Sequence, residues 1–319
     1  MTDMRYRQLG RSGLTVSVVG LGCNNFRSRC TDEQAAAVVD AAIDCGITLF
    51  DTADIYGGGG SEELLGEVLG SRREGIVVAT KFGLEMTDDD PQARGSRRYI
   101  RLAVEASLRR LRTDWIDLYQ YHAPDGITPP EETLAALGEL VDAGLVRYLG
   151  SSNFAGWQVA EAEHLARALG TERYISAQNE YSLLDRSVEA ELVPACTAYG
   201  VGILPYFPLA QGVLTGKYRR GQPLPEGTRL GNNRERADRL LVVEAYDRVE
   251  GLERVADKAG VTLLHLAIGG LAAQPAVSSV IAGATRPEQV RANAAAGLWE
   301  PTPDDLAAID EVVPSRRPG

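Results

Sequence analysis

Residues 47–81 read ITLFDTADIYGGGGSEELLGEVLGSRREGIVVATK and contain one complete strand–helix–strand unit. The runs 47–50 and 76–80 are short and apolar, as buried strands of a parallel sheet are. Between them, Ser61 precedes EELLGEVL, which has the apolar spacing of a helix. This stretch therefore predicts a βαβ unit, the building block of α/β proteins.

The same alternation continues along most of the chain. Residues that favour the first turn of a helix precede the helical stretches: Thr31 with Gln34, Ser96, Thr128-Pro129, and Thr285 with Glu288. The eight candidate strands cover residues 16–21, 47–50, 76–80, 115–121, 146–149, 174–178, 201–205 and 277–281. Because the βα repeats follow one another without a break in composition, the sequence predicts a single (β/α)8 TIM barrel, one domain over residues 1–319.

Further features of the barrel are predicted from its flanking segments. Residues 5–19, with RSG in the middle, fit a β-hairpin that covers the bottom of the barrel. Long loops follow the third and seventh strands, at 84–95 and 209–238. An open doubly wound sheet is the alternative fold. It needs a glycine-rich first turn, and GLGCNN at 20–25 lacks the third glycine of the dinucleotide fingerprint.

The composition is that of an ordinary globular protein, with 44% apolar and 24% charged residues among 319. The net charge of −11 argues against a nucleic-acid partner, because phosphate binding needs a basic surface. The N-terminus has no apolar leader, and the apolar run 261–273 is too short to span a bilayer. We expect that run to be a buried helix, and we expect no membrane partner.

The sequence predicts no metal site. The acidic run Asp88-Asp89-Asp90 fits a solvated loop, and His164 and His265 lie in helical stretches where structural roles are expected. The cysteines show no CxxC spacing and no histidine at metal-ligand spacing, which favours free thiols in a reducing cytoplasm. The four cysteines are Cys23, Cys30, Cys45 and Cys196. The expected location is therefore cytoplasmic.

Polar and aromatic residues stand at the carboxyl ends of six candidate strands. In a (β/α)8 barrel these ends meet at one mouth, where barrel enzymes carry out their chemistry. Each residue alone has a structural explanation, such as a helix cap for Asp51 or a satisfied core histidine for His122. Their recurrence at six strand ends favours an active site. These residues are Asp51, Lys81, His122, Ser152 with Asn153, Gln178 and Tyr206.

Several motifs occur in the order in which one known family has them: FDTADIYG, ATKFG, LYQYH, GSSNF, AQNEY, PLAQGVLTGK and GATRPEQVRAN. On these motifs the chain resembles the aldo-keto reductase family over essentially its whole length. It looks most similar to the branch that contains bacterial reductases and potassium-channel beta subunits. The resemblance implies reduction of aldehydes or ketones to alcohols by NADPH. It carries the family's four catalytic residues onto Asp51, Tyr56, Lys81 and His122.

Elementary chemistry explains these residue types. Hydride from the cofactor turns a carbonyl into an alkoxide that needs a proton, and a free phenol, with a pKa of about 10, is a reluctant donor. The ammonium of Lys81 would lower the pKa of Tyr56, and Asp51 would hold Lys81 charged. His122 can donate a hydrogen bond to the carbonyl oxygen. Tyr56 is therefore the expected proton donor.

The resemblance also implies a cofactor site. Ser152, Asn153 and Gln178 would hold the nicotinamide carboxamide, and Tyr206 would stack on the ring. The start of the last helix offers backbone N–H groups to a phosphate, beside Arg286. The expected cofactor-binding residues are Gly22, Cys23, Asn24, Asp51, Ser152, Asn153, Gln178, Tyr206, Leu209, Gly212, Lys217, Gly283, Thr285, Arg286, Gln289 and Asn293.

The sequence ranks cofactors but selects no substrate. Many family members carry a lysine at the position of Gly283, so recognition of a 2′-phosphate would rest on Arg286, and NADPH (or NADP+) is expected ahead of NADH. Lys217 would pair with a phosphate or a carboxylate. The expected partner is a small carbonyl compound, and the oligomeric state stays open. Candidate substrate walls are 24–26, Leu84, 123–127 and the loop 209–238.

Two other functions stay open at this point. One is a redox-sensing module that holds NADP(H) with little turnover. The other is a barrel isomerase or hydrolase that uses Lys81 or Asp51 differently.

Overall fold

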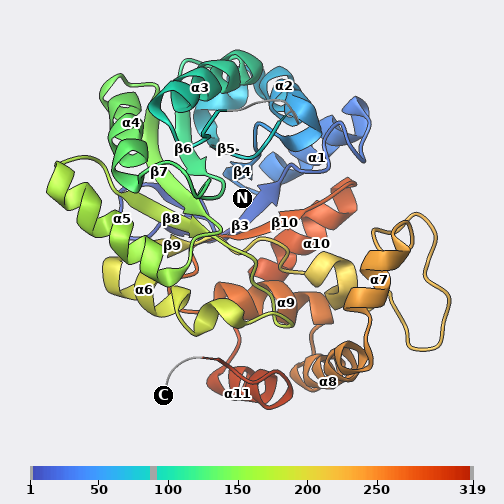
Figure 1. The fold of residues 1–319 in the computed structure, drawn as a ribbon. Helices are drawn as coiled ribbons and strands as arrows, with labels where there is room; N and C mark the ends of the chain where they lie inside the picture. Colours follow the sequence, from blue (N-terminus) through green and yellow to red (C-terminus); the bar gives the residue numbers. More distant parts are fainter. Residues whose placement is uncertain (1–2, 87–91, 317–319) are drawn as a thin grey trace.

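The structure, a computed structural model, describes residues 3–86 and 92–316; the acidic run Asp88–Asp90 lies outside them. Within these residues, eight parallel strands form a ring that helices surround (Figure 1). Neighbours in the sheet follow the order β10-β3-β4-β5-β6-β7-β8-β9. These strands are β3 (Val19–Gly22), β4 (Leu49–Asp51), β5 (Val77–Phe82), β6 (Ile116–Tyr121), β7 (Val146–Ser152), β8 (Tyr174–Gln178), β9 (Gly202–Ile203) and β10 (Val280–Gly283).

Backbone hydrogen bonds close the ring between its last two strands. The N–H of Ile203 donates to the carbonyl of Ala276 at 2.6 Å, and the N–H of Ser278 donates to the carbonyl of Ile203 at 2.9 Å. The strands also follow the chain around the ring without a reversal of order. The predicted (β/α)8 barrel is therefore confirmed, and the doubly wound alternative, which needs such a reversal, is wrong.

The first candidate strand, residues 16–21, is in fact two strands. Its start belongs to β2 (Thr15–Ser17), which pairs with β1 (Tyr6–Gln8) as the predicted antiparallel hairpin, and its end belongs to β3. Between them, Ser17 exchanges backbone-to-side-chain hydrogen bonds with Thr48, each 3.0 Å long. An apolar run cannot show where the chain leaves one sheet for another.

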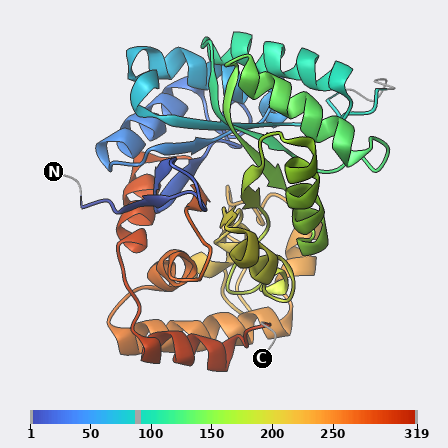
Figure 2. The ribbon, with the colours of Figure 1, turned by 90° about the vertical axis from the view of Figure 1, so that its left-hand side faces the viewer.

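The hairpin lies against one end of the barrel (Figure 2). Its buried residues Leu9 and Val16 join a small apolar cluster that fills the interior of the ring. That cluster also contains one residue from each of five strands and one that follows β9: Leu49, Ala79, Leu118, Ile175 and Ile281, and then Leu204. A much larger apolar cluster lies between the outer face of the sheet and the helices.

The helices surround the ring, and α8 and α11 pack against each other below it in Figure 1. The segment 209–238, predicted as one long loop, contains a short 3-10 helix and the start of α7. The α-helices are α1 (Asp32–Asp44), α2 (Gly60–Leu69), α3 (Arg97–Leu111), α4 (Pro130–Asp142), α5 (Gly156–Leu169), α6 (Leu192–Tyr199), α7 (Arg234–Leu240), α8 (Val243–Ala259), α9 (Leu263–Ala272), α10 (Pro287–Gly297) and α11 (Pro303–Val312). The 3-10 helices are η1 (Tyr56–Gly59), η2 (Gly70–Gly75), η3 (Ser187–Glu189) and η4 (Ala210–Thr215).

The helix-start signals are confirmed in part. Thr31 and Gln34 form the predicted capping box of α1, and Ser96 caps α3. Ser61, expected ahead of its helix, lies inside α2, where its buried hydroxyl donates to the carbonyl of Cys23 at 2.9 Å. Gly57, Gly58 and Gly59 supply the turn instead, because glycine adopts positive φ without strain.

The second predicted capping box, Thr285 with Glu288, is wrong. Arg286 is the residue before α10, and the backbone N–H of Thr285 donates to the side chain of Gln289 at 2.8 Å. The helix therefore begins one residue later than a Thr285 cap requires. The side chain that reaches back to close its first turn belongs to Gln289.

No single helix among the described residues is long and apolar enough to cross a membrane; α8 and α9 pass that test only as a pair, bent by 87°. The predicted buried helix within 261–273 is confirmed as α9. The cysteines Cys23, Cys30, Cys45 and Cys196 are free thiols. Within the same residues, no group of three His, Cys, Asp or Glu side chains is arranged to hold a metal ion.

Candidate active site

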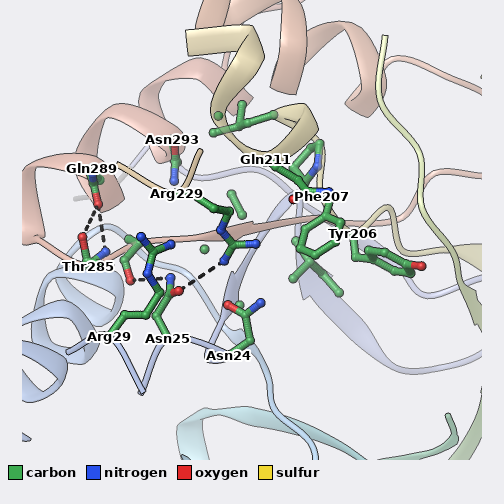
Figure 3. A pocket seen from close by; sticks show the side chains of 18 of the residues that line it. Asn24, Asn25, Arg29, Tyr206, Phe207, Gln211, Arg229, Thr285, Gln289 and Asn293 are labelled. Carbon is green, nitrogen blue, oxygen red and sulfur yellow. Dashed lines mark hydrogen bonds between the residues drawn. The ribbon is translucent and has the colours of Figure 1, made fainter. Parts of the chain in front are cut away.

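A pocket of about 940 Å³ opens at the carboxyl ends of the barrel strands (Figure 3). Its volume is near the upper end of the range for cofactor sites. Of the expected catalytic residues, Asp51, Tyr56 and His122 line it, whereas Lys81 lies behind its wall with no exposed surface. Every expected cofactor-binding residue lines the pocket except Cys23, which is fully buried.

Lys81 occupies a site built from three oxygen atoms. Its Nζ donates to Asp51 Oδ2 at 2.8 Å and to the carbonyl of Thr52 at 2.7 Å. It also donates to the phenol oxygen of Tyr56 at 3.4 Å. Burial alone would lower the pKa of Lys81, but Asp51 and Tyr56 reverse that effect and raise it above its ordinary value. Lys81 is therefore an ammonium at physiological pH.

Two buried amides fix the carboxylate of Asp51. Gln178 Nε2 donates to Asp51 Oδ1 at 2.7 Å, and Gln120 Nε2 donates to the same atom at 3.3 Å. Gln120 was missed at the sequence level. Its signal was its place in β6, two residues before His122, because alternate residues of a strand face the same side. The amides leave the other oxygen of Asp51 for Lys81.

Two opposing effects determine the pKa of Tyr56. Burial raises its pKa above the ordinary value of 10, and the nearby Lys81 ammonium offsets this rise only in part. The lowering effect expected of Lys81 is present, but burial outweighs it. A half-buried phenol with a raised pKa keeps its proton through neutral pH, so Tyr56 enters the reaction with a proton to donate.

His122 lies beside Tyr56, with the two rings edge to face and their centroids 6.0 Å apart. Burial, and secondarily the charge of Lys81, lowers the pKa of His122 to about 3. The imidazole is thus neutral at physiological pH. Its Nδ1 is buried and has no hydrogen-bond partner among the described residues. A neutral imidazole can still donate one hydrogen bond to a ligand in the pocket.

The side chain of Asn153 ties three pocket elements together. Its Nδ2 donates to the carbonyl of His122 at 2.9 Å and to Ser152 Oγ at 3.1 Å. Its Oδ1 accepts a hydrogen bond of 2.9 Å from the hydroxyl of Tyr206. Asn153 also has a φ of 59°, an unusual value for a non-glycine residue. The pocket wall is therefore held rigidly in the region where the resemblance places a nicotinamide.

Further positive-φ residues follow on the opposite wall. Phe207, Ala210 and Gln211 have φ values of 52°, 44° and 59°. Such non-glycine conformations cost of order 1–3 kcal/mol each and concentrate at functional sites. These backbone conformations turn the segment after β9 over the pocket. Phe207 and Gln211 of this segment form part of the lining (Figure 3).

The far end of the pocket carries positive charge. Arg229, from the loop before α7, and Arg29, from the loop before α1, both line it (Figure 3). Arg229 Nη2 donates to Asn25 Oδ1 at 3.4 Å, and its guanidinium stacks on Phe207 at 5.4 Å. Burial, and then the charge of Arg29, lowers the pKa of Arg229. Both arginines were missed, because their loops lie about two hundred residues apart in sequence.

Lys217, Arg286 and Gln289 add to this end of the pocket. Lys217 forms no ion pair within the described residues, and its ammonium lies 5.2 Å from the ring centre of Tyr218. Lys217 was expected to pair with a phosphate or a carboxylate. No carboxylate of the described residues pairs with it, and its pairing with an anion in the pocket stays a prediction.

The pocket lining contains only some of the predicted substrate walls, and their contact with a substrate stays a prediction. Asn24 and Asn25 line the pocket, whereas Phe26 is buried behind it. Leu84 and residues 123–127 are absent from the lining, because the loop after β6 turns outward toward α5. The two remaining histidines make helix contacts: His164 meets Tyr199, and His265 Nδ1 lies 2.8 Å from Thr262 Oγ1.

Fold and site together define a (β/α)8-barrel protein whose strand-end pocket carries acid–base side chains at one end and cations at the other. The family model for the aldo/keto reductase family matches residues 18–314. The chain belongs to the aldo/keto reductase family, and it is an oxidoreductase.

Similar proteins carry two kinds of name. The chain is 39% identical to a probable voltage-gated potassium channel subunit beta of Oryza sativa subsp. japonica, over 98% of each chain. It is equally similar, with the same coverage, to a protein of that name from Arabidopsis thaliana. It is 37% identical to the uncharacterized oxidoreductase YrpG of Bacillus subtilis (strain 168), over 90% of this chain and 89% of that one.

Proposed function

We propose that this chain reduces aldehydes or ketones to alcohols with NADPH, and that Tyr56 supplies the proton. The observation that carries the proposal is the contact of a protonated, half-buried phenol with a buried ammonium at the pocket wall, 3.4 Å apart. Asp51, fixed by its amide donors, holds that ammonium in place. The proposed substrate partner is a small carbonyl compound, and the proposed location is the cytoplasm.

Bound NADPH would supply hydride to the carbonyl carbon. The residues of the chain then handle the oxygen. Tyr56 transfers its proton to the developing alkoxide, and Lys81 stabilises the phenolate that remains. Neutral His122 donates a hydrogen bond that orients the carbonyl oxygen toward Tyr56. Asp51 keeps Lys81 charged through the cycle.

The donor set of the pocket fits a phosphate-rich dinucleotide. Burial, and then the charge of Arg29, lowers the pKa of Arg229, and neither arginine is paired with a carboxylate within the described residues. An anion between them would relieve this repulsion, and arginine matches phosphate oxygens in a planar fork. NADPH carries a 2′-phosphate that NADH lacks, so this cation group supports NADPH as the preferred cofactor.

Replacement of Tyr56 by phenylalanine tests the catalytic assignment. The variant should lose at least about a thousandfold in kcat for an activated aldehyde such as 4-nitrobenzaldehyde, because the proton donor is gone. It should still quench intrinsic fluorescence on binding NADPH. Tyr6→Phe, an exposed tyrosine on the hairpin, is the matched control. Near-normal aldehyde reduction by Tyr56→Phe would refute the assignment of the proton donor.

Replacement of Arg229 by methionine tests the cofactor preference. The variant should bind NADPH at least about tenfold more weakly and leave NADH binding nearly unchanged, because only NADPH presents the extra phosphate. Arg234→Met, at a position whose side chain is 83% exposed, is the control. An equal loss for both cofactors would show that Arg229 does not read the 2′-phosphate.

A regulatory role is the second candidate, because two similar proteins are named as channel beta subunits. In that case the chain would bind NADP(H) tightly and turn over very slowly on every carbonyl compound. Single-turnover measurements with NADPH across a broad aldehyde and ketone panel separate the two functions. The same measurements with NADH test the cofactor preference independently.

A further inference from the structure

A second cavity, of about 190 Å³, lies outside the barrel between α4 and α5. Its described lining shares no residue with the larger pocket at the strand ends. The loop after β6 covers one side, which explains why residues 123–127 do not contribute to the active-site pocket. An apolar cavity of about 150 Å³ is enough to bind a benzene ring, so this one can hold a single-ring ligand.

Aromatic side chains make up much of the cavity surface. Tyr121, Phe154 and Tyr174 form a continuous wall, with ring centroids 6.1 Å apart in the first pair and 5.8 Å in the second. Trp157 stands at the mouth, 58% exposed. A large exposed tryptophan beside a ready-made aromatic cavity marks a binding surface.

The charges of the cavity all have one sign. Asp125 and Glu161 belong to its lining, and no lysine, arginine or histidine does so among the described residues. Asp125 accepts hydrogen bonds from the backbone N–H groups of Gly95, Ile127 and Thr128 and from the Thr128 hydroxyl, each between 2.7 and 2.9 Å. Burial opposes its ionisation, but these bonds lower the pKa of Asp125 to about 2. Its carboxylate is therefore charged and immobile at physiological pH.

The start of α4 lies on the same cavity, and the positive end of a helix dipole favours anions rather than cations. That effect is already offset, because Glu131 and Glu132 occupy the first turn of α4. The fixed carboxylate of Asp125 is bound to backbone N–H groups just before the helix. Carboxylates therefore offset the helix dipole at the cavity, and Arg94, whose charge acts on Tyr121, lies outside the lining.

We infer that this cavity is a binding site for a small organic cation, an ammonium group that carries a single ring or short alkyl groups. Aromatic faces attract ammonium ions through their quadrupoles, and adjacent carboxylates add charge complementarity. Neutral aromatic ligands would use the same walls without the electrostatic gain. Anions of the same size would meet two carboxylates. The inference is independent of the proposed reductase function, since it concerns a separate cavity.

The test compares three single-ring ligands of different charge: phenyltrimethylammonium, benzyl alcohol and benzoate. Each is titrated into the full chain by isothermal calorimetry, and the intrinsic tryptophan fluorescence is followed in parallel in the wild type and in Trp157→Ala, so that the contribution of Trp157 is the difference. The cation should bind saturably and at least about tenfold more tightly than benzyl alcohol, and benzoate should not bind. Equal binding of the neutral ring, or no binding of the cation up to millimolar concentrations, would overturn the inference.

Two variants place the cation in this cavity. Glu161→Gln should weaken binding of phenyltrimethylammonium about fivefold, and Trp157→Ala more strongly, because each removes one source of attraction. Glu172→Gln, which removes another exposed carboxylate away from the cavity, is the matched control. Unchanged affinity in both variants would place the cation elsewhere. Self-association that Trp157→Ala abolishes would instead assign this surface to a second copy of the chain.

Discussion

Lys81 carries a charge where no water reaches it, and its neighbours make this possible. The ammonium has three oxygen partners, one of them the carboxylate of Asp51, so its hydrogen-bonding capacity is filled. A buried ion pair rarely adds stability by itself, because desolvation consumes most of the Coulomb energy. We therefore attribute the pair to the chemistry of the proposed reaction rather than to the stability of the barrel.

Asp54, three residues after Asp51, is a buried carboxylate without comparable partners. Neither of its carboxylate oxygens has a hydrogen-bond partner among the described residues. Burial, and then the negative charge of Glu62, raises the pKa of Asp54 from 3.8 to about 7. Because the folded-state pKa is raised, the folded chain favours the protonated acid, and the associated stability is lost as the pH rises from the unfolded-state pKa of 3.8 through the folded-state value of about 7.

Asp54→Asn should therefore flatten the pH dependence of stability. Between about pH 5 and pH 8 the wild-type chain should lose about 2–3 kcal/mol of unfolding free energy that the variant keeps. Urea unfolding at both pH values measures this difference. Asp44→Asn, at an exposed aspartate of α1, should behave like the wild type. A parallel pH dependence in Asp54→Asn would mean that Asp54 is ionised throughout.

At the scale of the element, the turn that carries Tyr56 is rich in glycine, and a side chain from another helix packs over it. Gly57, Gly58 and Gly59 all have positive φ, a conformation that glycine adopts freely. The side chain of Arg110, from α3, lies over the turn, and its Cδ is 2.8 Å from where a Cβ on Gly59 would be. Arg110 in turn donates to Glu62 of α2 at 2.7 Å. We infer that this contact keeps the Tyr56 hydroxyl within reach of the Lys81 ammonium.

Arg110→Met should lower kcat about tenfold and change KM less than about twofold, because a looser turn misplaces the proton donor without removing a binding group. Arg110→Lys should restore part of the rate. Arg109→Met, an exposed neighbour on α3, serves as the control. A lower melting temperature with unchanged kcat would show that Arg110 only stabilises the fold.

At the scale of the whole molecule, stability and chemistry occupy opposite ends of the barrel. The hairpin covers the amino ends of the strands, and Leu9, with no exposed surface, packs into the interior cluster. The pocket opens at the carboxyl ends. Barrel enzymes commonly divide the two tasks in this way, so a change at the bottom should leave the pocket intact.

Leu9→Ala should cost about 2–5 kcal/mol of unfolding free energy, because it removes a filled volume from the barrel interior. The value of kcat/KM for an aldehyde at low temperature should stay within about twofold of wild type. Leu102→Ala, at a leucine of α3 that is 49% exposed, should change stability by less than about 0.5 kcal/mol. A large loss of kcat/KM in Leu9→Ala would show that the two ends are coupled.

The sequence by itself determined the alternation of strands and helices and the residues at the strand ends. Both are local properties, since the period of the apolar residues sets the element and the turn after a strand sets which residue reaches its end. The barrel followed because eight such units without a break have few ways to bury their strands. Asp51, Lys81 and His122 were therefore identifiable before any fold was known.

Only the tertiary structure decided the environment of those residues. It brought Gln120 and Gln178 onto Asp51, and it placed Arg29 and Arg229 at one end of the pocket. It also added the effect of burial at Tyr56, which raises the pKa of the phenol more than the neighbouring ammonium lowers it. The physical reason is the same in each case. Desolvation and long-range contacts depend on which distant segments meet, and no local pattern in a sequence records that.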